Sequence, residues 1–246
     1  MTHYFGDVCI HIHLCNDQAF LLQHNHNHVY AHVHDDVQDH YYGCGLVIPT
    51  DLEGITAIDL GSGAGRDCYI LSQLVGEKGH VIGVDMTQEQ LDIANKYIGY
   101  HTEEFGYSSP NVEFRKGFIE DLKAVGIEDN SVDLIVSNCV INLCPEKEKV
   151  ISECARVLKE GGEMYFSDVY SDSRVPEELK KDKVLYGECI SGALYWNDFI
   201  HMAHKFGFKM PILVKSRRLT LNNEEIEKKV GKYKFYSVTY RLVKCS

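Results

Sequence analysis

Three glycines at every second position follow a short apolar run near residue 60. They are Gly61, Gly63 and Gly65, and the run before them ends in Asp59 and Leu60. Glycine lets the backbone approach a ligand closely, and a helix that begins here would direct its unpaired N–H groups at the same point. The spacing therefore predicts a strand that breaks into a turn and a helix, as in nucleotide-type sites.

Two carboxylates make this site more specific. Asp59 lies at the predicted strand end, where it could meet the ammonium group of a methionine-type ligand. Asp85 closes the next apolar run, where its carboxylate could accept bonds from both hydroxyls of a ribose. Downstream, a predicted helix ends in Gly161 and Gly162 and leads into another apolar run. Together these features point to S-adenosylmethionine as the cofactor.

Further residues extend the predicted cofactor site. A nicotinamide dinucleotide would use similar parts, but the glycine spacing here is closer than the spacing that makes room for a pyrophosphate. Ile119 and Glu120 follow the third predicted strand and could flank and bond an adenine, and Asn138 ends the fourth strand at the ligand-binding edge. The candidate cofactor residues are Asp59, Gly61, Ser62, Gly63, Gly65, Arg66, Asp85, Met86, Ile119, Glu120 and Asn138.

Three of the nine cysteines lie in predicted loops. Cys139 directly follows Asn138, Cys44 lies between two glycines, and Cys189 lies in an irregular stretch after the fifth predicted strand. A cysteine between glycines in a loop is poorly explained as core filling. By contrast, we expect small buried hydrophobes at Cys68, Cys144 and Cys154.

The elements that must position these residues alternate between strand and helix from residue 54 onward. Strands are predicted at 55–60, 80–85, 112–116, 132–137 and 163–169, and helices at 66–75, 87–105 and 146–159. Thr87 is the predicted N-cap of the second helix, with Gln90 completing a capping box. The pattern predicts an α/β fold with a Rossmann-like, doubly wound and mostly parallel sheet.

The last third of the sequence is less regular. Helical spacing returns in 197–206, where Phe199, Met202, Ala203 and Phe206 share one face and should pack. Residues 235–243 alternate polar and apolar, which predicts a half-buried antiparallel strand at the sheet edge. We therefore divide the chain into a cofactor-binding core at 37–170 and a substrate-binding insert, last helix and edge strands at 171–246.

Residues 1–36 form a separate, atypical segment. Nine of the thirteen histidines lie within the first forty residues, without a clear apolar period. A histidine-rich tract can bind transition metals, but a polar tract that packs poorly is the commoner explanation.

Composition excludes several classes of protein. A net charge of -11 and the lack of a basic stripe argue against nucleic-acid binding and favour a small substrate. No apolar run approaches the roughly 20 residues of a membrane span, and no targeting segment is evident. We therefore expect a cytoplasmic protein whose cysteines are mostly free thiols.

Six motifs together closely resemble those of the arsenite methyltransferase family. They lie at 41–49, 59–67, 76–81, 136–143, 166–170 and 187–196, and the resemblance runs from about Val33 to the end of the chain. It implies a class I S-adenosylmethionine-dependent methyltransferase that methylates trivalent arsenic in detoxification. Arsenite and methylated arsenicals would be its ligands, and a thiol reductant such as glutathione or thioredoxin its co-substrate. The usual C-terminal domain of the family is not found in this sequence.

The same resemblance assigns roles to individual residues. It implies that Cys44, Cys139 and Cys189 bind arsenic(III) or take part in its thiol chemistry, and that Tyr42 lies against the cofactor. Cys15 has the separation from Cys44 expected of a fourth, redox-active cysteine, but its neighbours do not match the family. Trivalent arsenic is soft and binds thiolates, so the enzyme's task would be chiefly to position arsenic near the methyl group.

Two other functions fit the same residues. One is a methyltransferase of this fold that acts on a small organic molecule, in which the cysteines only pack. The other is a non-catalytic metalloid-binding protein that uses the thiols and the histidine tract. Product formation and cysteine replacement would separate the three hypotheses.

Overall fold

The computed structural model describes residues 30–41, 48–49, 51–182, 185, 189–220 and 224–245. The predictions made for Cys15, Tyr42 and Cys44 lie outside these residues. In the described part of the chain, no helix combines the length and apolar character that crossing a bilayer requires.

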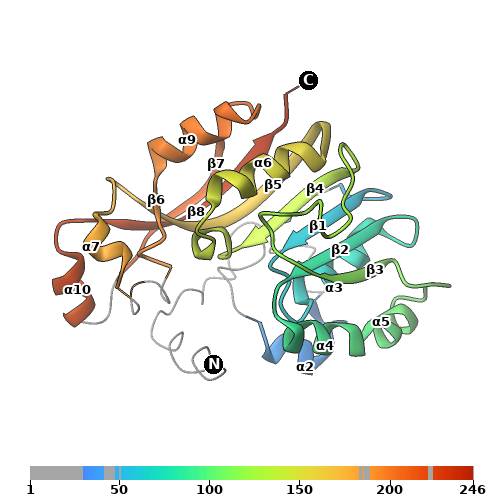
Figure 1. Cartoon of the computed structure of the whole chain (residues 1–246). Coiled ribbons are helices and arrows are strands. Elements are labelled where there is room, and N and C mark those ends of the chain that lie inside the picture. Colours follow the sequence, from blue (N-terminus) through green and yellow to red (C-terminus); the bar gives the residue numbers. More distant parts are fainter. Residues whose placement is uncertain are drawn as a thin grey trace.

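One eight-stranded sheet organises the molecule (Figure 1). The strand order is β3-β2-β1-β4-β5-β8-β7, and β6 pairs with β5 beside this path. The parallel strands are β1 (Thr56–Leu60), β2 (His80–Asp85), β3 (Val112–Lys116), β4 (Val132–Asn138), β5 (Leu158–Ser171) and β6 (Leu194–Tyr195). The antiparallel strands are β8 (Phe235–Val243) and β7 (Ile212–Arg218). This confirms the predicted Rossmann-like, mostly parallel sheet.

The order in which successive strands are added to the sheet reverses beside β1. Strand β1 pairs with β2 on one side and with β4 on the other, so β1 and β4 are neighbours that are far apart in sequence. In open α/β sheets, ligands bind outside the carboxyl ends of the strands at such a switch point. Asp59, the glycine turn and Asn138 all lie at this position.

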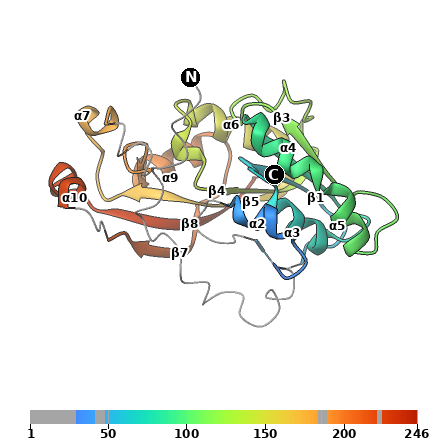
Figure 2. The same cartoon turned by 90° about the horizontal axis from the view of Figure 1, so that it is seen from below.

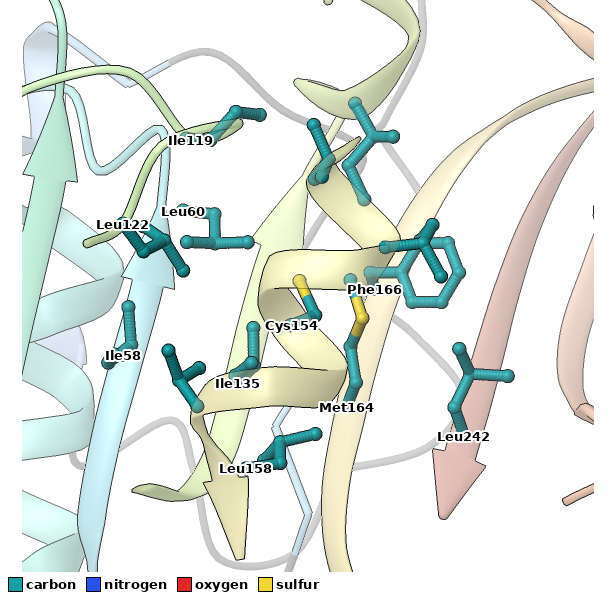
Figure 3. Packing of buried hydrophobic residues seen from close by; sticks show 14 of the residues in the cluster. Ile58, Leu60, Ile119, Leu122, Ile135, Cys154, Leu158, Met164, Phe166 and Leu242 are labelled. Carbon is teal, nitrogen blue, oxygen red and sulfur yellow. The ribbon is translucent and has the colours of Figure 1, made fainter. Parts of the chain in front are cut away.

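Two buried layers hold helices against opposite faces of the sheet. On one face, Ile58 and Leu60 of β1 lie in one cluster with Cys154 of α6 (Lys147–Val157) (Figure 3). Phe199 of α9 (Trp196–Lys205) belongs to the same cluster. On the other, Ala57 packs with α3 (Arg66–Val75) and with Val37 of α2 (Asp35–Asp39). Alternate residues of β1 thus serve different layers, as the pleat of a strand requires.

The predicted packing residues behave as expected. Phe199 and Ala203 are buried, and Met202 and Phe206 pack against the same cluster. The three cysteines assigned to the core are buried too, at Cys68, Cys144 and Cys154.

Three element predictions were wrong in detail. The helix expected at 87–105 is two helices, α4 (Gln88–Lys96) and α5 (Ile98–Glu104), separated by Tyr97. Thr87 is the N-cap of α4 as predicted, but its side chain makes no capping bond, so the capping box is absent, and the Thr87 N–H donates to the carboxylate of Asp85 at 2.8 Å. The predicted antiparallel edge of the sheet is confirmed, but β7 forms its outermost strand and β8 lies between β5 and β7. Sequence reasoning missed β7 because its side chains are exposed on both faces and do not alternate.

A third, smaller cluster lies at the far end of the sheet from α4 and α5. It includes Val169 of β5, Ile226 and Val230 of α10 (Glu224–Val230), and Ile190 and Ala193 next to Cys189. Figures 1 and 2 show α10 and α7 (Glu177–Lys180) at this end. The segment that carries Cys189 therefore packs onto a core of its own.

Candidate functional site

The glycine turn has the geometry that only glycine adopts readily. Gly61, Gly63 and Gly65 have φ angles of +74°, +53° and +89°. A Cβ atom on Gly61 would lie 2.4 Å from Cγ2 of Val140, and one on Gly65 would lie 2.6 Å from Cζ of Phe114. Helix α3 begins directly after Gly65, so its first N–H groups face the turn. The predicted strand–turn–helix unit is confirmed, and its backbone is open to a close ligand.

Asp85 fixes the turn to the start of α4. Its Oδ2 accepts the N–H of Gly63 at 2.9 Å and its Oδ1 accepts the N–H of Thr87 at 2.8 Å. Each carboxylate oxygen can accept more than one hydrogen bond. Asp85 therefore keeps acceptor capacity for a pair of hydroxyls, as expected for a ribose.

Asp59 is a buried carboxylate, and few groups of the protein offset the cost of burying its charge. Burial, together with the nearby negative charge of Asp67, raises its pKa well above the usual range, and the Cys68 thiol that donates to it opposes this only in part. A bound cation would stabilise the ionised form, because an opposite charge offsets both burial and like-charge repulsion. Asp59 thus fits the ammonium group predicted for the ligand.

Two buried polar atoms beside the turn have no hydrogen-bond partner in the structure, Oγ of Ser62 and Oε1 of Gln90. A Cβ on Gly63 would lie 3.8 Å from Oε1 of Gln90, which places this atom over the turn. Buried polar atoms are normally hydrogen-bonded, so both fit a ligand with polar groups at this point. Sequence reasoning missed Gln90 as a site residue because it assigned this side chain to the helix cap.

A connected group of side chains lies beside α3. The Arg66 guanidinium lies 3.0 Å from the ring centroid of Tyr41 and forms an ion pair with Asp67. Nδ2 of Asn138 donates to the Tyr41 hydroxyl at 2.6 Å. The structure therefore brings two predicted cofactor residues, Arg66 and Asn138, into one network, and adds Tyr41 to them.

The residues expected around an adenine have mixed surroundings. Met86 is 58 % exposed directly after β2, whereas Ile119 is only 7 % exposed and packs in the core. Its neighbour Phe118 is 59 % exposed and offers the accessible apolar surface after β3. Glu120 hydrogen-bonds the buried Cys144 thiol. Phe118 was overlooked because the neighbouring Ile119 was assigned to the adenine instead.

The two described cysteines of the predicted thiol site share an uncommon backbone conformation. Cys139 and Cys189 have φ angles of +58° and +57°. Non-glycine residues in this region carry local strain, which concentrates at functional sites. The Cys139 N–H donates to the carbonyl of Ser167 on β5 at 2.8 Å, so its turn is held against the neighbouring strand.

The turns that carry these cysteines meet although 50 residues separate them. The Cys189 sulfur lies 3.8 Å from the carbonyl oxygen of Cys139, which it faces as a hydrogen-bond donor. Cys189 is a thiol, whereas Cys139 is disulfide-bonded. Soft ions could therefore bind to both sulfurs only after Cys139 is reduced. Within the described ranges, no three histidine, cysteine or acidic side chains gather as metal ligands.

The glycine turn is in direct contact with the turn that carries Cys139. Val140 follows Cys139 in the chain, and it is the side chain of Val140 that fills the space where Gly61 lacks a Cβ. Cys139 is thus one residue away from the wall of the turn. The arrangement can hold a ligand over the glycines and a thiol-bound atom beside it.

Comparisons with known proteins agree with this geometry. Residues 51–207 match the model of a methyltransferase domain family. The chain is 55 % identical to an arsenite methyltransferase of Aquipseudomonas alcaligenes over 214 residues, and 54 % identical to the arsenite methyltransferase of Homo sapiens. These matches cover 87 % of the chain but only 61 % and 57 % of the two relatives.

Among solved structures, an arsenic(III) S-adenosylmethionine methyltransferase from Chlamydomonas reinhardtii aligns with a TM-score of 0.86 and 47 % identity. This alignment covers 89 % of the chain and 73 % of that structure. The residues matched by the methyltransferase domain family, 51–207, include the glycine turn, Cys139 and Cys189. The chain therefore belongs to the methyltransferase domain family and, within it, to the arsenic(III) S-adenosylmethionine methyltransferases.

Proposed function

We propose that this chain transfers a methyl group from S-adenosylmethionine to trivalent arsenic held by cysteine thiolates. The observation that carries the proposal is the contact of the Gly61 turn with Val140, next to Cys139, while the Cys189 sulfur lies 3.8 Å from the Cys139 carbonyl. The activity named for the relatives from A. alcaligenes and H. sapiens supports it.

The cofactor would lie over the glycine turn. Asp59 would bind its ammonium group, Asp85 its ribose hydroxyls, and the unpartnered atoms of Ser62 and Gln90 would accept or donate further bonds. Met86 would cover the adenine, as Phe118 would from the neighbouring strand end. When bound, S-adenosylmethionine supplies an electrophilic methyl group on a sulfonium sulfur.

The thiols would hold the substrate beside that methyl group. Cys139 and Cys189 would bind arsenic as thiolates, and we assign Cys44 as the third sulfur from the family motif that it shares. Three sulfurs around arsenic leave its lone pair directed away from them. The protein then needs to align this lone pair with the methyl group and keep water out, because arsenic bound to sulfur has no proton to lose.

The disulfide state of Cys139 supports a thiol reductant as co-substrate. Before arsenic can bind this sulfur, a small thiol or a protein dithiol such as glutathione or thioredoxin must reduce it. We accordingly propose that the chain works in a reducing compartment, the cytoplasm.

A labelled-methyl assay tests the function. The reduced protein is incubated with arsenite, excess thiol and S-adenosylmethionine that carries an isotopic label in its methyl group, and the products are separated by chromatography. We expect label in methylated arsenicals. Label in an added small organic acceptor with none in arsenic would overturn the assignment, as would arsenite binding without any product.

A further inference from the structure

Asn142 connects three segments at the thiol end of the candidate site, by which we mean the turns that carry Cys139 and Cys189. It is 2 % exposed and lies in the short 3-10 helix Ile141–Leu143 that follows β4. Its main-chain N–H donates to Oδ2 of Asp168 at 2.9 Å, and its side-chain Nδ2 donates to the carbonyl of Val169 at 2.6 Å. The same Nδ2 lies 3.5 Å from the carbonyl oxygen of Cys189. One amide thus joins the end of β4, strand β5 and the Cys189 turn.

A second contact joins the same two segments through the main chain of Asn142. A Cβ on Gly192 would lie 2.0 Å from the backbone oxygen of Asn142, so the chain after Cys189 is seated directly on this residue. Between them, Ile190 is fully buried in the third cluster. The position of the Cys189 turn is therefore set by the packing of Ile190 and by its contacts with Asn142.

Asp168 keeps Asn142 in place. Its carboxylate is 1 % exposed, and besides the N–H of Asn142 it accepts its own neighbour's N–H, that of Val169, at 2.9 Å. The carboxylate thereby holds the 3-10 helix against β5. Because Asp168 holds the main chain of Asn142, the side chain of Asn142 is directed at the Cys189 turn.

We propose that Asn142 is a positioning residue for the substrate, which sets the separation of the Cys139 and Cys189 sulfurs by tying the Cys189 turn to the end of β4. This inference rests on the proposed function, because the separation matters only if both sulfurs bind one atom. Asn142 acts on the Cys189 turn through the carbonyl of Cys189, which its Nδ2 faces at 3.5 Å. Small displacements of reacting groups have large effects on rate, so the tether should matter for arsenic and not for the cofactor.

The test uses Asn142→Ala with Asn111→Ala as its matched control. Asn111 is also buried, and its Nδ2 also donates to two backbone carbonyls, those of Ser72 and Gly76, at the other end of the sheet. Both variants are reduced and assayed for arsenite binding by protection of Cys139 and Cys189 from alkylation, read peptide by peptide in a mass spectrometer. Cofactor binding is measured by calorimetry, and stability by thermal unfolding.

For Asn142→Ala we expect arsenite binding to weaken about 10- to 100-fold, as for other residues that orient ligand side chains, with cofactor affinity within about twofold of the unmodified chain. Asn111→Ala should lose similar stability and bind arsenite normally. Equal arsenite affinity in the two variants and the unmodified chain would overturn the positioning role and leave the proposed function standing. Absence of arsenite protection in the unmodified chain would instead overturn the function.

A second variant guards against loss of folding in the first. Gly192→Ala adds a methyl group against the backbone oxygen of Asn142, so that the Cys189 turn must move away. Gly99→Ala is its control, because a Cβ there meets no atom within 4 Å. We expect Gly192→Ala to weaken arsenite protection as Asn142→Ala does, while unchanged protection would contradict the inference.

Discussion

The two ends of the candidate site are built in different ways. At the cofactor end, the turn of Gly61 to Gly65 and the bonds from Asp85 to Gly63 and Thr87 are formed by segments at most 22 residues apart. At the thiol end, Cys189 reaches Cys139 across 50 residues, and Asn142 contacts Val169 and Cys189 across 27 and 47. The glycine turn with Asp85 is a local motif, whereas the thiol end is an assembly of distant turns.

This difference separates two physical requirements. A cofactor site of this kind needs backbone that can approach the ligand, which glycine supplies within one short segment. A site that holds one soft atom by several sulfurs needs donors from different directions, which one short segment cannot provide. The thiol end should therefore respond to changes in distant packing, and the cofactor end chiefly to changes in its own turn.

The largest effect is expected from replacing a sulfur at the thiol end. Cys139→Ser or Cys189→Ser should lower methyl transfer to arsenite by about 100-fold or more, because a lost ligand leaves arsenic misplaced. Cofactor affinity should stay the same in both variants. The exposed Cys245 provides the control Cys245→Ser, which should transfer methyl groups normally. Full activity in Cys189→Ser would contradict the proposed division of the site.

A change at the cofactor end should have the reverse pattern. Gly61→Ala places a methyl group 2.4 Å from Cγ2 of Val140 at a φ of +74°, whereas Gly76→Ala meets nothing within 4 Å at a φ of +71°. Both variants therefore carry backbone strain of about 1 kcal/mol, and only Gly61→Ala adds a steric clash of about 1–3 kcal/mol. Calorimetry should show about 10-fold weaker cofactor binding for Gly61→Ala and no change for Gly76→Ala. Equal cofactor affinity in the two variants would contradict the assignment of the Gly61 turn to the cofactor site.

Asp59→Asn tests whether the buried carboxylate serves the ligand rather than the fold. Because the pKa of Asp59 is raised in the folded state, its contribution to stability is lost as pH rises above the unfolded value, so the charge destabilises the free protein near pH 7. The variant should therefore unfold at a higher temperature without ligand, yet bind the cofactor about 10-fold more weakly.

The control for this experiment is Asp92→Asn, at an exposed position of α4, which should change neither quantity. A variant of Asp59 that is less stable without ligand would contradict the assigned role. The two readouts must move in opposite directions for the ligand explanation to hold.

The smallest effect on the site is expected from His101, which lies away from both ends. Burial lowers the pKa of His101 to about 4, and its ring stacks on Tyr69 while accepting the N–H of His34. Since the folded pKa lies below the unfolded value of 6.5, stability should fall by about 2 kcal/mol as pH drops from 6.5 to 4.

His101→Phe should flatten this pH dependence in urea unfolding, with cofactor and arsenite affinity unchanged at pH 7.5. His204→Gln is the control, because His204 is exposed. An unaltered slope in His101→Phe would place the acid sensitivity elsewhere in the molecule.

Much of the fold was predictable because its signals are local. Strands β1 to β4 and α3 follow apolar runs and the glycine turn, and their predicted bounds lie within one residue of those observed, whereas β5 begins at Leu158, five residues before its predicted start, and β6 was not predicted. The break at Tyr97 was missed because no local pattern marks it, and the hydroxyl of this residue bonds Asp36 of α2, which is 61 residues away in the sequence. Strand β7 was missed for a related reason, because it is defined by pairing with β8 and not by a pattern of buried side chains.

The sequence alone determined the glycine turn and the carboxylates at the strand ends, because each depends on residue type at a fixed spacing, whereas the proposal that sulfur binds the substrate came from the resemblance of the cysteine motifs to those of the family. Tertiary structure alone decided that Cys139 and Cys189 meet, that Val140 packs on Gly61, and that Gln90 lies unpartnered over the turn. These are contacts between segments that only strand pairing and core packing bring together. Spacing along a chain specifies conformation within a few residues, and long-range packing specifies which of them become neighbours.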